Sequence, residues 1–322
     1  MTYRGPARPI RGRFAPSPSG RMHLGNALSA LLAWLSVRSA GGVMVLRLED
    51  LDPVRCRPEF ARQVEEDLRW LGLDWDEGGL AAGPQWSQSG RRDLYEAQLT
   101  RLEAMGLTYP CFCTRGDLHA ASAPHASDGT PLYSGACRNL TAEQRAERAK
   151  SRHPSIRIQT PDRDISFVDG NLGPFSQNLA RDCGDFILRR SDGVHAYQLA
   201  VVTDDGDMRI TQVVRGRDLL NSTPRQLWLQ ELLDLPHPDY FHIPLLLSPG
   251  GRRLSKRDSD LDLGALRAAG VTPEAIVGRL AFWAELTPTP APVRASELIP
   301  HFSWAHVKKE DITIPRLDRP LF

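Results

Sequence analysis

The first residues whose types and spacing could do chemistry lie near the N-terminus, in the run RFAPSPSGRMHLGN from Arg13 to Asn26. A proline- and glycine-rich turn between a strand and a helix leaves backbone N–H groups at the helix N-terminus free to meet an anion. Gly20 and Gly25 would let the backbone approach a nucleotide closely, and His23 could donate to a phosphate as its charge develops. Taken alone, the run fits a connecting turn equally well.

A second run of this kind follows Gly250 and Gly251 and reads RLSKR from Arg253 to Arg257. A glycine-led loop tipped by Lys256 and two arginines can fold over a triphosphate and stabilise the pyrophosphate as it leaves. By itself, this run is explained better as a solvated basic loop.

Three of the five cysteines fall in one short window, as Cys111-Phe-Cys113 followed after nineteen residues by Tyr133-Ser-Gly-Ala-Cys137. Three cysteines and a fourth donor suit a tetrahedral zinc, which would be structural because such a set leaves no open coordination position. His119 and His125 in the intervening loop are chemically better fourth donors than a phenol. Three reduced cysteines without a metal are the alternative.

The elements that must position these residues follow from hydrophobic periodicity. A short strand at Arg11 to Ala15 leads into the first run, and Val43 to Leu48 predicts a buried strand. Between them and after them, apolar residues at helical spacing predict two helices with one buried face each, on Leu28, Leu31, Leu32 and Leu35, and on Phe60, Val64, Leu68 and Leu71. A third helix is expected from about 91 to 105. The alternation of strand and helix indicates right-handed crossovers and a parallel sheet, hence an α/β fold.

The rest of the chain adds shorter elements. Thr141-Ala-Glu-Gln144 has the pattern of a capping box and predicts a short polar helix. Strands are expected at 155–159, 185–190, 195–202 and 208–214, and a helix begins near Thr223 with Pro224 as its first residue. The part after about Leu261 is predicted to be mostly helical.

Bulk properties narrow the class of protein. The 322 residues are enough for about two domains, and 41% hydrophobic and 25% charged residues are ordinary for a globular chain. A net charge of +1 gives no indication of a bulk polyanion binder. We expect no membrane span and no signal peptide. The clustered cysteines argue against a disulfide framework and predict a reducing, cytoplasmic location.

The order and separation of the two runs resemble the HIGH and KMSKS signatures of class I aminoacyl-tRNA synthetases. RFAPSPSGRMHLGN, RLEDLDP, YQLAVVTDD, VVRGRDLL and RRLSKRD resemble the glutamyl-tRNA synthetase group from about Gly12 to Asp258. The resemblance implies a Rossmann-type parallel-sheet catalytic domain with a small zinc-binding insertion and a short helical C-terminal subdomain. The expected boundaries are 1–110 and 166–240 for the two catalytic halves, 111–165 for the insertion and connective segment, and 241–322 for the KMSKS-type loop and helices.

The resemblance also implies roles by position. The expected glutamate-binding residues are Arg13, Phe14, Ala15, Pro16, Ser17, Glu49, Tyr197 and Arg215. Those for ATP are His23, Gly25, Asn26 and Lys256, with His23 and Lys256 catalytic, and the zinc ligands are Cys111, Cys113, Tyr133 and Cys137. The planar guanidinium groups of Arg13 and Arg215 can bind carboxylates bidentately. Without the resemblance, a structural role would be the better interpretation of each residue: Glu49 as part of a helix-capping cluster, Tyr197 as a core aromatic, and Arg215 as the ion-pair partner of Asp218.

Chain length bears on the second substrate. Only 66 residues follow Lys256 (322 − 256), too few for an anticodon-reading domain and the helices that support the core. In this shortness the chain resembles the glutamyl-Q tRNA(Asp) synthetase family, and we expect the activity of that family. That family activates L-glutamate with ATP, accompanied by Mg²⁺, without tRNA. It then transfers glutamate to queuosine at the first anticodon position of tRNA(Asp).

Other functions stay open at this stage. The nearest alternative is a truncated glutamyl-tRNA synthetase that charges a tRNA 3′ end. The others are a small-molecule nucleotidyltransferase and a zinc-containing RNA-binding module without activity. We expect the chain to act as a monomer.

Overall fold

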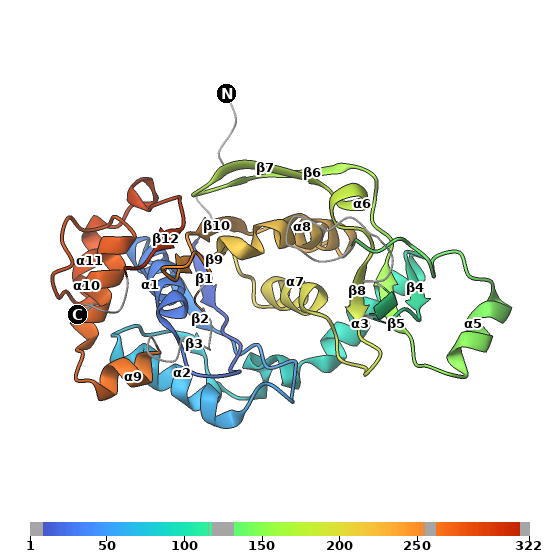
Figure 1. Ribbon diagram of the computed structural model, residues 1–322, viewed down its shortest axis with the longest axis horizontal. Coiled ribbons are helices and arrows are strands. Elements are labelled where there is room, and N and C mark those ends of the chain that lie inside the picture. The colour runs from blue at the N-terminus through green and yellow to red at the C-terminus, as the bar shows by residue number, and fades with distance from the viewer. Residues whose placement is uncertain (1–8, 115, 118–131, 253, 255–261, 316–322) are drawn as a thin grey trace.

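A five-stranded parallel sheet lies at the centre of the computed structural model, which describes residues 9–114, 116–117, 132–252, 254 and 262–315 (Figure 1). Its strand order is β10-β9-β1-β2-β3, and every neighbouring pair is parallel. The strands are β1 (Arg11–Phe14), β2 (Val43–Leu46), β3 (Glu77–Gly78), β9 (Gln212–Gly216) and β10 (Asp239–Ile243). The predicted α/β class with a parallel sheet is thereby confirmed.

The order of the strands reverses next to β1. The chain runs from β1 through α1 (Leu24–Ser39) to β2 and through α2 (Pro58–Trp70) to β3, whereas β9 and β10 lie on the other side of β1. The chain segments that leave the carboxyl ends of β1 and β9 therefore lead to strands on opposite sides of the sheet. Such a switch point leaves a crevice at that edge of an open parallel sheet, where ligands bind.

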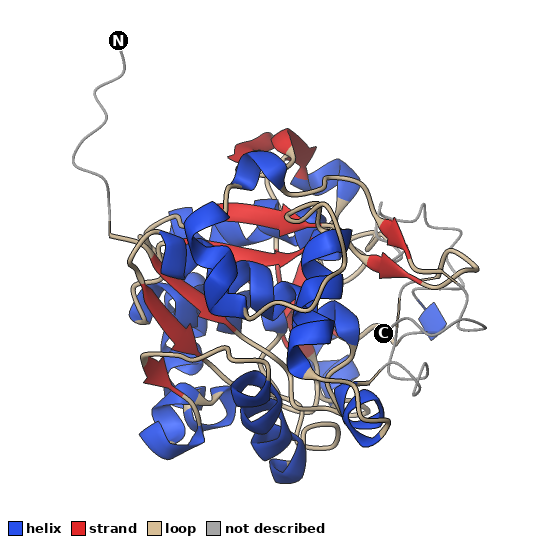
Figure 2. Cartoon of the chain, turned by 90° about the vertical axis from the view of Figure 1, so that its left-hand side faces the viewer, coloured by secondary structure: helices blue, strands red, loops and turns tan. Residues whose placement is uncertain are grey.

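Helices cover both faces of this sheet (Figure 2). Alternate residues of one strand enter different cores, because successive side chains point to opposite faces. Met44 and Leu46 pack with α1 and α2, whereas Val45 packs with α3 (Arg92–Ala104), α7 (Tyr197–Asp207) and α8 (Thr223–Leu232). Helix α1 is buried along nearly its whole length and is the central support of the first core.

A smaller unit at one end of the molecule carries the clustered cysteines (Figure 1). It contains the antiparallel sheet β4 (Thr108–Cys111), β5 (Ser155–Ile158) and β8 (Phe186–Arg189), together with α5 (Ala142–Ala149). The hairpin of β6 (Asp164–Asp169) and β7 (Gly173–Asn178) follows, and then the short α6 (Leu179–Asp182). The hairpin was not expected from the sequence, because polar residues and a proline interrupt the apolar alternation of its strands.

The C-terminal part packs on α1 at the opposite end of the molecule (Figure 1). As predicted, it is mainly helical, with α9 (Leu263–Ala268), α10 (Pro273–Trp283) and α11 (Ala295–Leu298), and β11 (Leu246–Leu247) pairs in parallel with β12 (Ile312–Thr313). Short 3₁₀ turns complete the described chain at Leu80–Ala82, Pro84–Trp86, Gln88–Gly90, Arg217–Ser222, Ile299–His301 and Trp304–His306. No helix in the described ranges is both long and apolar enough to cross a bilayer.

One predicted strand is wrong. The run 195–202 was expected to be a strand, but Tyr197 begins α7, whose residues from Leu199 to Asp205 are all buried. A helix buried on nearly every side shows no amphipathic period, so its short apolar run could not be told from a core strand. The strand expected at 208–214 begins later, at Gln212.

Candidate active site

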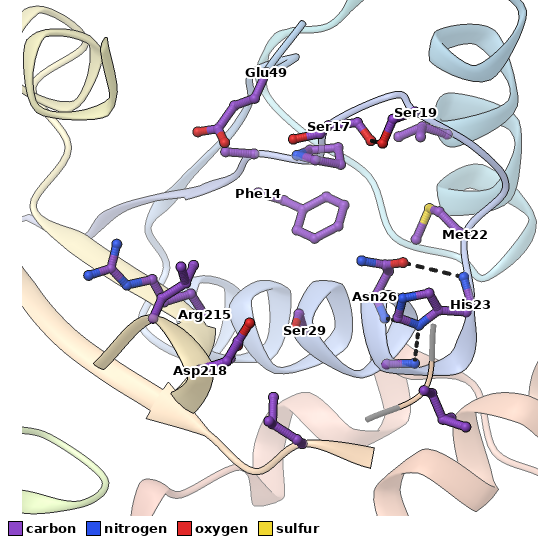
Figure 3. Close-up of a pocket in the computed structure, with 18 of the residues that line it drawn as sticks. Phe14, Ser17, Ser19, Met22, His23, Asn26, Ser29, Glu49, Arg215 and Asp218 are labelled. Carbon is purple, nitrogen blue, oxygen red and sulfur yellow. Dashed lines mark hydrogen bonds between the residues drawn. The ribbon is translucent and has the colours of Figure 1, made fainter. Parts of the chain in front are cut away.

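A cavity of about 420 Å³ opens at the carboxyl edge of the sheet, between the ends of β1 and β9. Figure 3 shows Glu49 and Arg215 toward one end of it and His23 with Asn26 toward the other. Every glutamate or ATP residue expected from the sequence and described by the structure lines it, namely Arg13, Phe14, Ala15, Pro16, Ser17, His23, Gly25, Asn26, Glu49, Tyr197 and Arg215. The structure therefore brings together residues that lie as much as 202 positions apart (215 − 13).

His23 caps the N-terminus of α1. Its Nδ1 accepts hydrogen bonds from the backbone N–H groups of Gly25 at 3.1 Å and Asn26 at 3.4 Å, while the Asn26 side chain accepts from the backbone of His23. Because Nδ1 accepts, the ring proton of the neutral imidazole resides on Nε2. A Cβ atom at Gly25 would come within 3.0 Å of His23 Cε1, so the absence of a side chain there lets the ring fold over the helix end.

Arg13 leaves β1 and enters the cavity with weak contacts to protein. Its side chain is 4% exposed, and its Nε and Nη1 lie 3.4 Å from Asp205 Oδ1 and 3.5 Å from the Val214 carbonyl oxygen. These distances are at the limit of a hydrogen bond. A buried guanidinium held so loosely has donors available for a ligand carboxylate.

Arg215 at the end of β9 is held more firmly. Its Nη1 donates to Gln226 Oε1 and its Nη2 to Thr223 Oγ1, both at 2.8 Å, and its Nε donates to His242 Nε2 at 3.0 Å. The guanidinium also lies over the Tyr240 ring, 5.1 Å from its centroid. The alternative reading as a plain ion pair with Asp218 does not describe these contacts.

Glu49 follows β2 and supplies a buried carboxylate to the cavity. Arg47 Nη2 donates to it at 3.1 Å. Burial raises the pKa of Glu49 above its ordinary value, and the charges of Arg47 and Arg13 oppose that rise. A cation such as an ammonium group would stabilise the ionised form of this carboxylate further.

Tyr197 is the first residue of α7 and borders the same cavity. Within the described ranges, no hydrogen bond to its hydroxyl is found. Burial, followed by the charge of Glu49, raises its pKa, so the hydroxyl is a neutral donor at the cavity wall.

Three charged residues beneath the cavity were not among the predicted site residues. Arg47, fully buried, donates to Asp205 Oδ1 at 2.6 Å and lies 3.6 Å from Asp204 Oδ2. Asp204 also accepts from Arg91 at 2.6 Å and from Tyr95 at 2.9 Å. Arg47 lies in the run RLEDLDP, and Asp204 and Asp205 end the run YQLAVVTDD. The sequence therefore contained all three residues in runs already singled out, but only the fold shows that the two runs meet.

The segment that carries Lys256 lies outside the described residues, but described residues on either side of it lie next to the cavity wall. On one side, the Leu254 backbone N–H donates to the Leu246 carbonyl oxygen at 3.0 Å, and Leu254 lines the cavity. On the other side, Asp262 forms a bridge with His23, and the Leu263 N–H donates to the Met22 carbonyl at 2.9 Å.

Cys111, Cys113 and Cys137 form a compact group in the smaller unit. Their sulfur atoms lie within 4.8 Å of one another, so the group could hold a metal ion. Cys113 Sγ lies 3.7 Å from Cys137 Sγ, much longer than a disulfide bond of about 2.05 Å. Burial, followed by the neighbouring Cys111, raises the pKa of Cys113 to about 12, because a second thiolate beside the first is disfavoured.

The Tyr133 hydroxyl faces the same cysteines, 3.4 Å from Cys111 Sγ and 4.0 Å from Cys113 Sγ. It also accepts the backbone N–H of Cys137 at 2.8 Å, and the Arg157 guanidinium lies 3.9 Å from the centroid of its ring. The alternative donors, His119 and His125, lie outside the described residues.

The sequence pattern described as tRNA synthetases class I (E and Q), catalytic domain, matches residues 9–309. The chain is 52% identical to a glutamyl-Q tRNA(Asp) synthetase of Symbiobacterium thermophilum, with 94% of this chain and 95% of that protein covered. It is 49% identical to one of Nitratidesulfovibrio vulgaris, over 96% of this chain and 98% of the relative.

Solved structures give the same likeness. The glutamate-tRNA synthetase of Elizabethkingia anophelis superposes with a TM-score of 0.82 at 30% identity, over 96% of this chain and 68% of that one. A glutamate tRNA ligase from Elizabethkingia meningosepticum, solved in complex with its amino acid, gives a TM-score of 0.80 at 30% identity, over 95% and 67% of the two chains.

Proposed function

The chain belongs to the catalytic-domain family of class I tRNA synthetases for glutamate and glutamine, and from that premise we propose that it is a glutamyl-Q tRNA(Asp) synthetase. In this reaction L-glutamate is activated with ATP in the absence of tRNA. The glutamyl group is then transferred to queuosine at the first anticodon position of tRNA(Asp). The enzyme is a ligase.

One observation carries the proposal: two relatives that are named for this activity match this chain across 95% and 98% of their own lengths, at 52% and 49% identity. The cavity agrees with an amino acid that bears two carboxylates and one ammonium group. Two buried guanidinium groups, Arg13 and Arg215, and one buried carboxylate, Glu49, line it.

We assign the glutamate to this end of the cavity. The side-chain carboxylate meets the two N–H groups of Arg215 that have no partner among the described residues, and Arg13 supplies a second guanidinium for a carboxylate. Glu49 receives the α-ammonium, and the Tyr197 hydroxyl donates from the rim. The backbone from Phe14 to Ser17 forms the floor between β1 and α1.

ATP, with its Mg²⁺, occupies the end near α1. The α-carboxylate of glutamate attacks the α-phosphorus, the bond to pyrophosphate breaks, and glutamyl-adenylate forms. Gly25 and Asn26 line this end of the cavity, and His23 Nδ1 accepts their backbone N–H groups. The charge that develops on the phosphates therefore meets the positive end of the α1 dipole and the Nε2–H of His23. Lys256 is assigned to the departing pyrophosphate. Substitution at phosphorus depends mainly on positioning and charge stabilisation, so this step needs no strong general base.

In the second step a queuosine hydroxyl oxygen attacks the carbonyl carbon of the adenylate. An ester forms, AMP leaves with the electrons of the broken C–O bond, and the hydroxyl proton passes to solvent. The rival acceptor, the 3′ end of a tRNA, would react with the same adenylate, so only the acceptor distinguishes the two activities.

The clustered cysteines are assigned to a structural zinc with Tyr133 as the fourth ligand. Tetrahedral zinc with Zn–S bonds of about 2.3 Å sets neighbouring sulfurs about 3.8 Å apart, close to the 3.7 Å between Cys113 and Cys137. The metal would tie β4 to the segment around Cys137 and takes no part in the chemistry of the cavity.

We further propose a cytoplasmic monomer. No disulfide bond joins any two of the five cysteines, all of which the structure describes, as expected in a reducing compartment.

The exchange of labelled pyrophosphate into ATP tests the first half-reaction. We expect exchange that requires L-glutamate and proceeds without any tRNA. Exchange without glutamate would indicate a small-molecule nucleotidyltransferase, and no exchange under any condition would indicate a binding protein.

A further inference from the structure

A line of three buried side chains runs into the cavity from outside it. His242 Nδ1 lies 2.6 Å from Asp169 Oδ2, and His242 Nε2 lies 3.0 Å from Arg215 Nε. Asp169 is 2% exposed, His242 0% and Arg215 5%. Only Arg215 lines the cavity, so the other two can affect a ligand there only through it.

The hydrogen bonds define one tautomer of His242. A guanidinium can only donate, so Nε2 must accept from Arg215, and the ring proton must lie on Nδ1, where it is donated to Asp169. Thr223 packs beside the same pair: its Oγ1 accepts from Arg215 Nη2 at 2.8 Å and lies 3.3 Å from His242 Nε2.

Electrostatics keeps the ring neutral. Burial lowers the pKa of His242, and the charge of Arg215 lowers it further against the opposing effects of Asp169 and Asp218. Burial alone would raise the pKa of Asp169, but His242 and the backbone N–H groups of Leu172 and His242 hold it below its ordinary value. The buried aspartate is therefore ionised while the histidine is not.

The carboxylate of Asp169 is itself held in place by backbone hydrogen bonds. Asp169 ends β6, and its Oδ1 accepts the backbone N–H groups of Asn171 at 3.0 Å and Leu172 at 2.8 Å. The next residue, Gly170, donates its N–H to the Tyr240 carbonyl at 2.8 Å. A Cβ atom there would overlap the Phe241 ring, so the hairpin rests directly on β10.

The hydrogen bonds of Arg215 fix its orientation without neutralising its charge. Three of its five N–H groups are donated to His242, Gln226 and Thr223, all of which are uncharged. Two N–H groups have no partner among the described residues. A direct aspartate contact would cancel much of the charge of the guanidinium, whereas a neutral imidazole fixes its plane and leaves that charge to a ligand.

We propose that Asp169 and His242 are positioning residues that set Arg215 for the side-chain carboxylate of glutamate and thereby determine selectivity against glutamine. The inference rests on the proposed function, because it names how that substrate is recognised. A glutamine amide is neutral and offers only one acceptor oxygen, and its NH₂ group would face one of the two remaining N–H groups, so it leaves a buried cation without a counter-charge.

The substitution Asp169→Asn tests this at nearly constant volume. Backbone N–H groups at Oδ1 would retain the amide oxygen there and turn its NH₂ toward His242 Nδ1. The ring would then carry its proton on Nε2, facing the Arg215 Nε–H. We expect the KM for glutamate in pyrophosphate exchange to rise by at least about tenfold, the preference for glutamate over glutamine to fall, and the KM for ATP to stay within about twofold.

A double-mutant cycle separates positioning from general damage. In an Arg215→Lys background, Asp169→Asn should add less than about a twofold change, because the partner through which it acts is already lost. Asp185→Asn is the matched control: Asp185 is also buried and accepts from Tyr109, Arg138 and Thr160, away from the cavity. It should change thermal stability and leave amino-acid selectivity intact.

If Asp169→Asn does not fold, a comparison of the amino-acid selectivity of His242→Gln and His242→Leu tests the proposal instead. The Gln oxygen can still accept near the position of Nε2, so we expect this variant to retain most of the selectivity that the Leu variant loses. An unchanged KM for glutamate in folded Asp169→Asn, an equal effect in the Arg215→Lys background, or equal behaviour of the two His242 variants would overturn the proposal. Absence of glutamate-dependent exchange in the unsubstituted chain would instead refute the proposed function.

Discussion

Arg47 Nη1 donates to Asp205 Oδ1 over 2.6 Å, and the two side chains are 0% and 4% exposed. This pair joins the loop after β2 to α7 directly below the cavity. The same Asp205 oxygen is the nearest anion to Arg13, 3.4 Å from its Nε. The charge of Arg47 is thus shared between Asp205, which also contacts Arg13, and Glu49.

Asp205→Asn should weaken this arrangement on two counts. Breaking a buried ion pair leaves part of the charge of Arg47 uncompensated, so we expect the free energy of unfolding to fall by about 3 kcal/mol. We also expect the KM for glutamate to rise by about tenfold, because Arg47, which donates to Glu49, loses the carboxylate that holds it in place. Urea denaturation and pyrophosphate exchange measure the two effects, and a stable variant with normal glutamate affinity would show that the pair supports neither.

His23 should have two separable roles. His23→Asn keeps a side-chain oxygen that can cap α1, so we expect little loss of stability, whereas His23→Ala should cost about 1 kcal/mol. Both variants lose the Nε2–H donor, so both should lower kcat of exchange by about 100-fold. Equal activity of His23→Asn and the parent chain would contradict a role for His23 in the phosphate chemistry.

The cysteine group should contain one zinc per chain, measured by elemental analysis. Removal of the metal by a strong chelator, or by Cys137→Ser, should lower the thermal midpoint, because structural zinc contributes folding free energy. Tyr133→Phe tests the fourth ligand separately: it removes only the hydroxyl and should speed transfer of zinc to a colorimetric chelator. Release rates equal to those of the parent would exclude the phenol as a ligand.

Asp67 predicts a pH dependence of stability. It is 1% exposed on α2, and its Oδ2 has no hydrogen-bond partner among the described residues. Burial raises its pKa from 3.8 to about 6, against the opposing effects of Gln63 on its own helix and Arg267 on α9 and with small contributions from Glu66 and Asp262. Because the folded value is the higher one, the folded state binds more protons between the two values. Stability is therefore lost as pH rises from 3.8 through 6.

Asp67→Asn removes this cost. We expect the variant to be more stable than the parent by roughly 2 kcal/mol at about pH 8, with the difference disappearing toward about pH 4. Glu66→Gln, an exposed neighbour on the same helix, is the matched control and should not change stability. A constant difference across the pH range would show that the charge of Asp67 is not its cause.

The parts of the site that lie in continuous runs could be predicted from sequence. Residues 13–17, His23, Gly25 and Asn26 lie in one continuous run that spans the end of β1, the turn after it and the start of α1, and the strand–helix alternation around them indicates the parallel sheet. The structure places these residues, with Glu49, Tyr197 and Arg215, around one cavity.

What could not be predicted depends on contacts between distant segments. Asp204 and Asp205 lie in a run whose uniform burial hid the helix α7, so their approach to Arg47 was not foreseen. Asp169 ends β6, the first strand of a hairpin that shows no clear alternation, and its contact with His242 spans 73 residues. Local pattern contains no information on such pairs, because it reports burial and period but not which buried groups meet.

The identity of the acceptor is the central claim, and transfer of labelled glutamate to tRNA(Asp) tests it most directly. tRNA(Asp) with queuosine and the same tRNA without it should be compared under identical conditions, since their 3′ ends are the same. We expect glutamate to be attached only to the tRNA that contains queuosine. Equal attachment to both would contradict the account and identify the chain as a synthetase that charges the 3′ end.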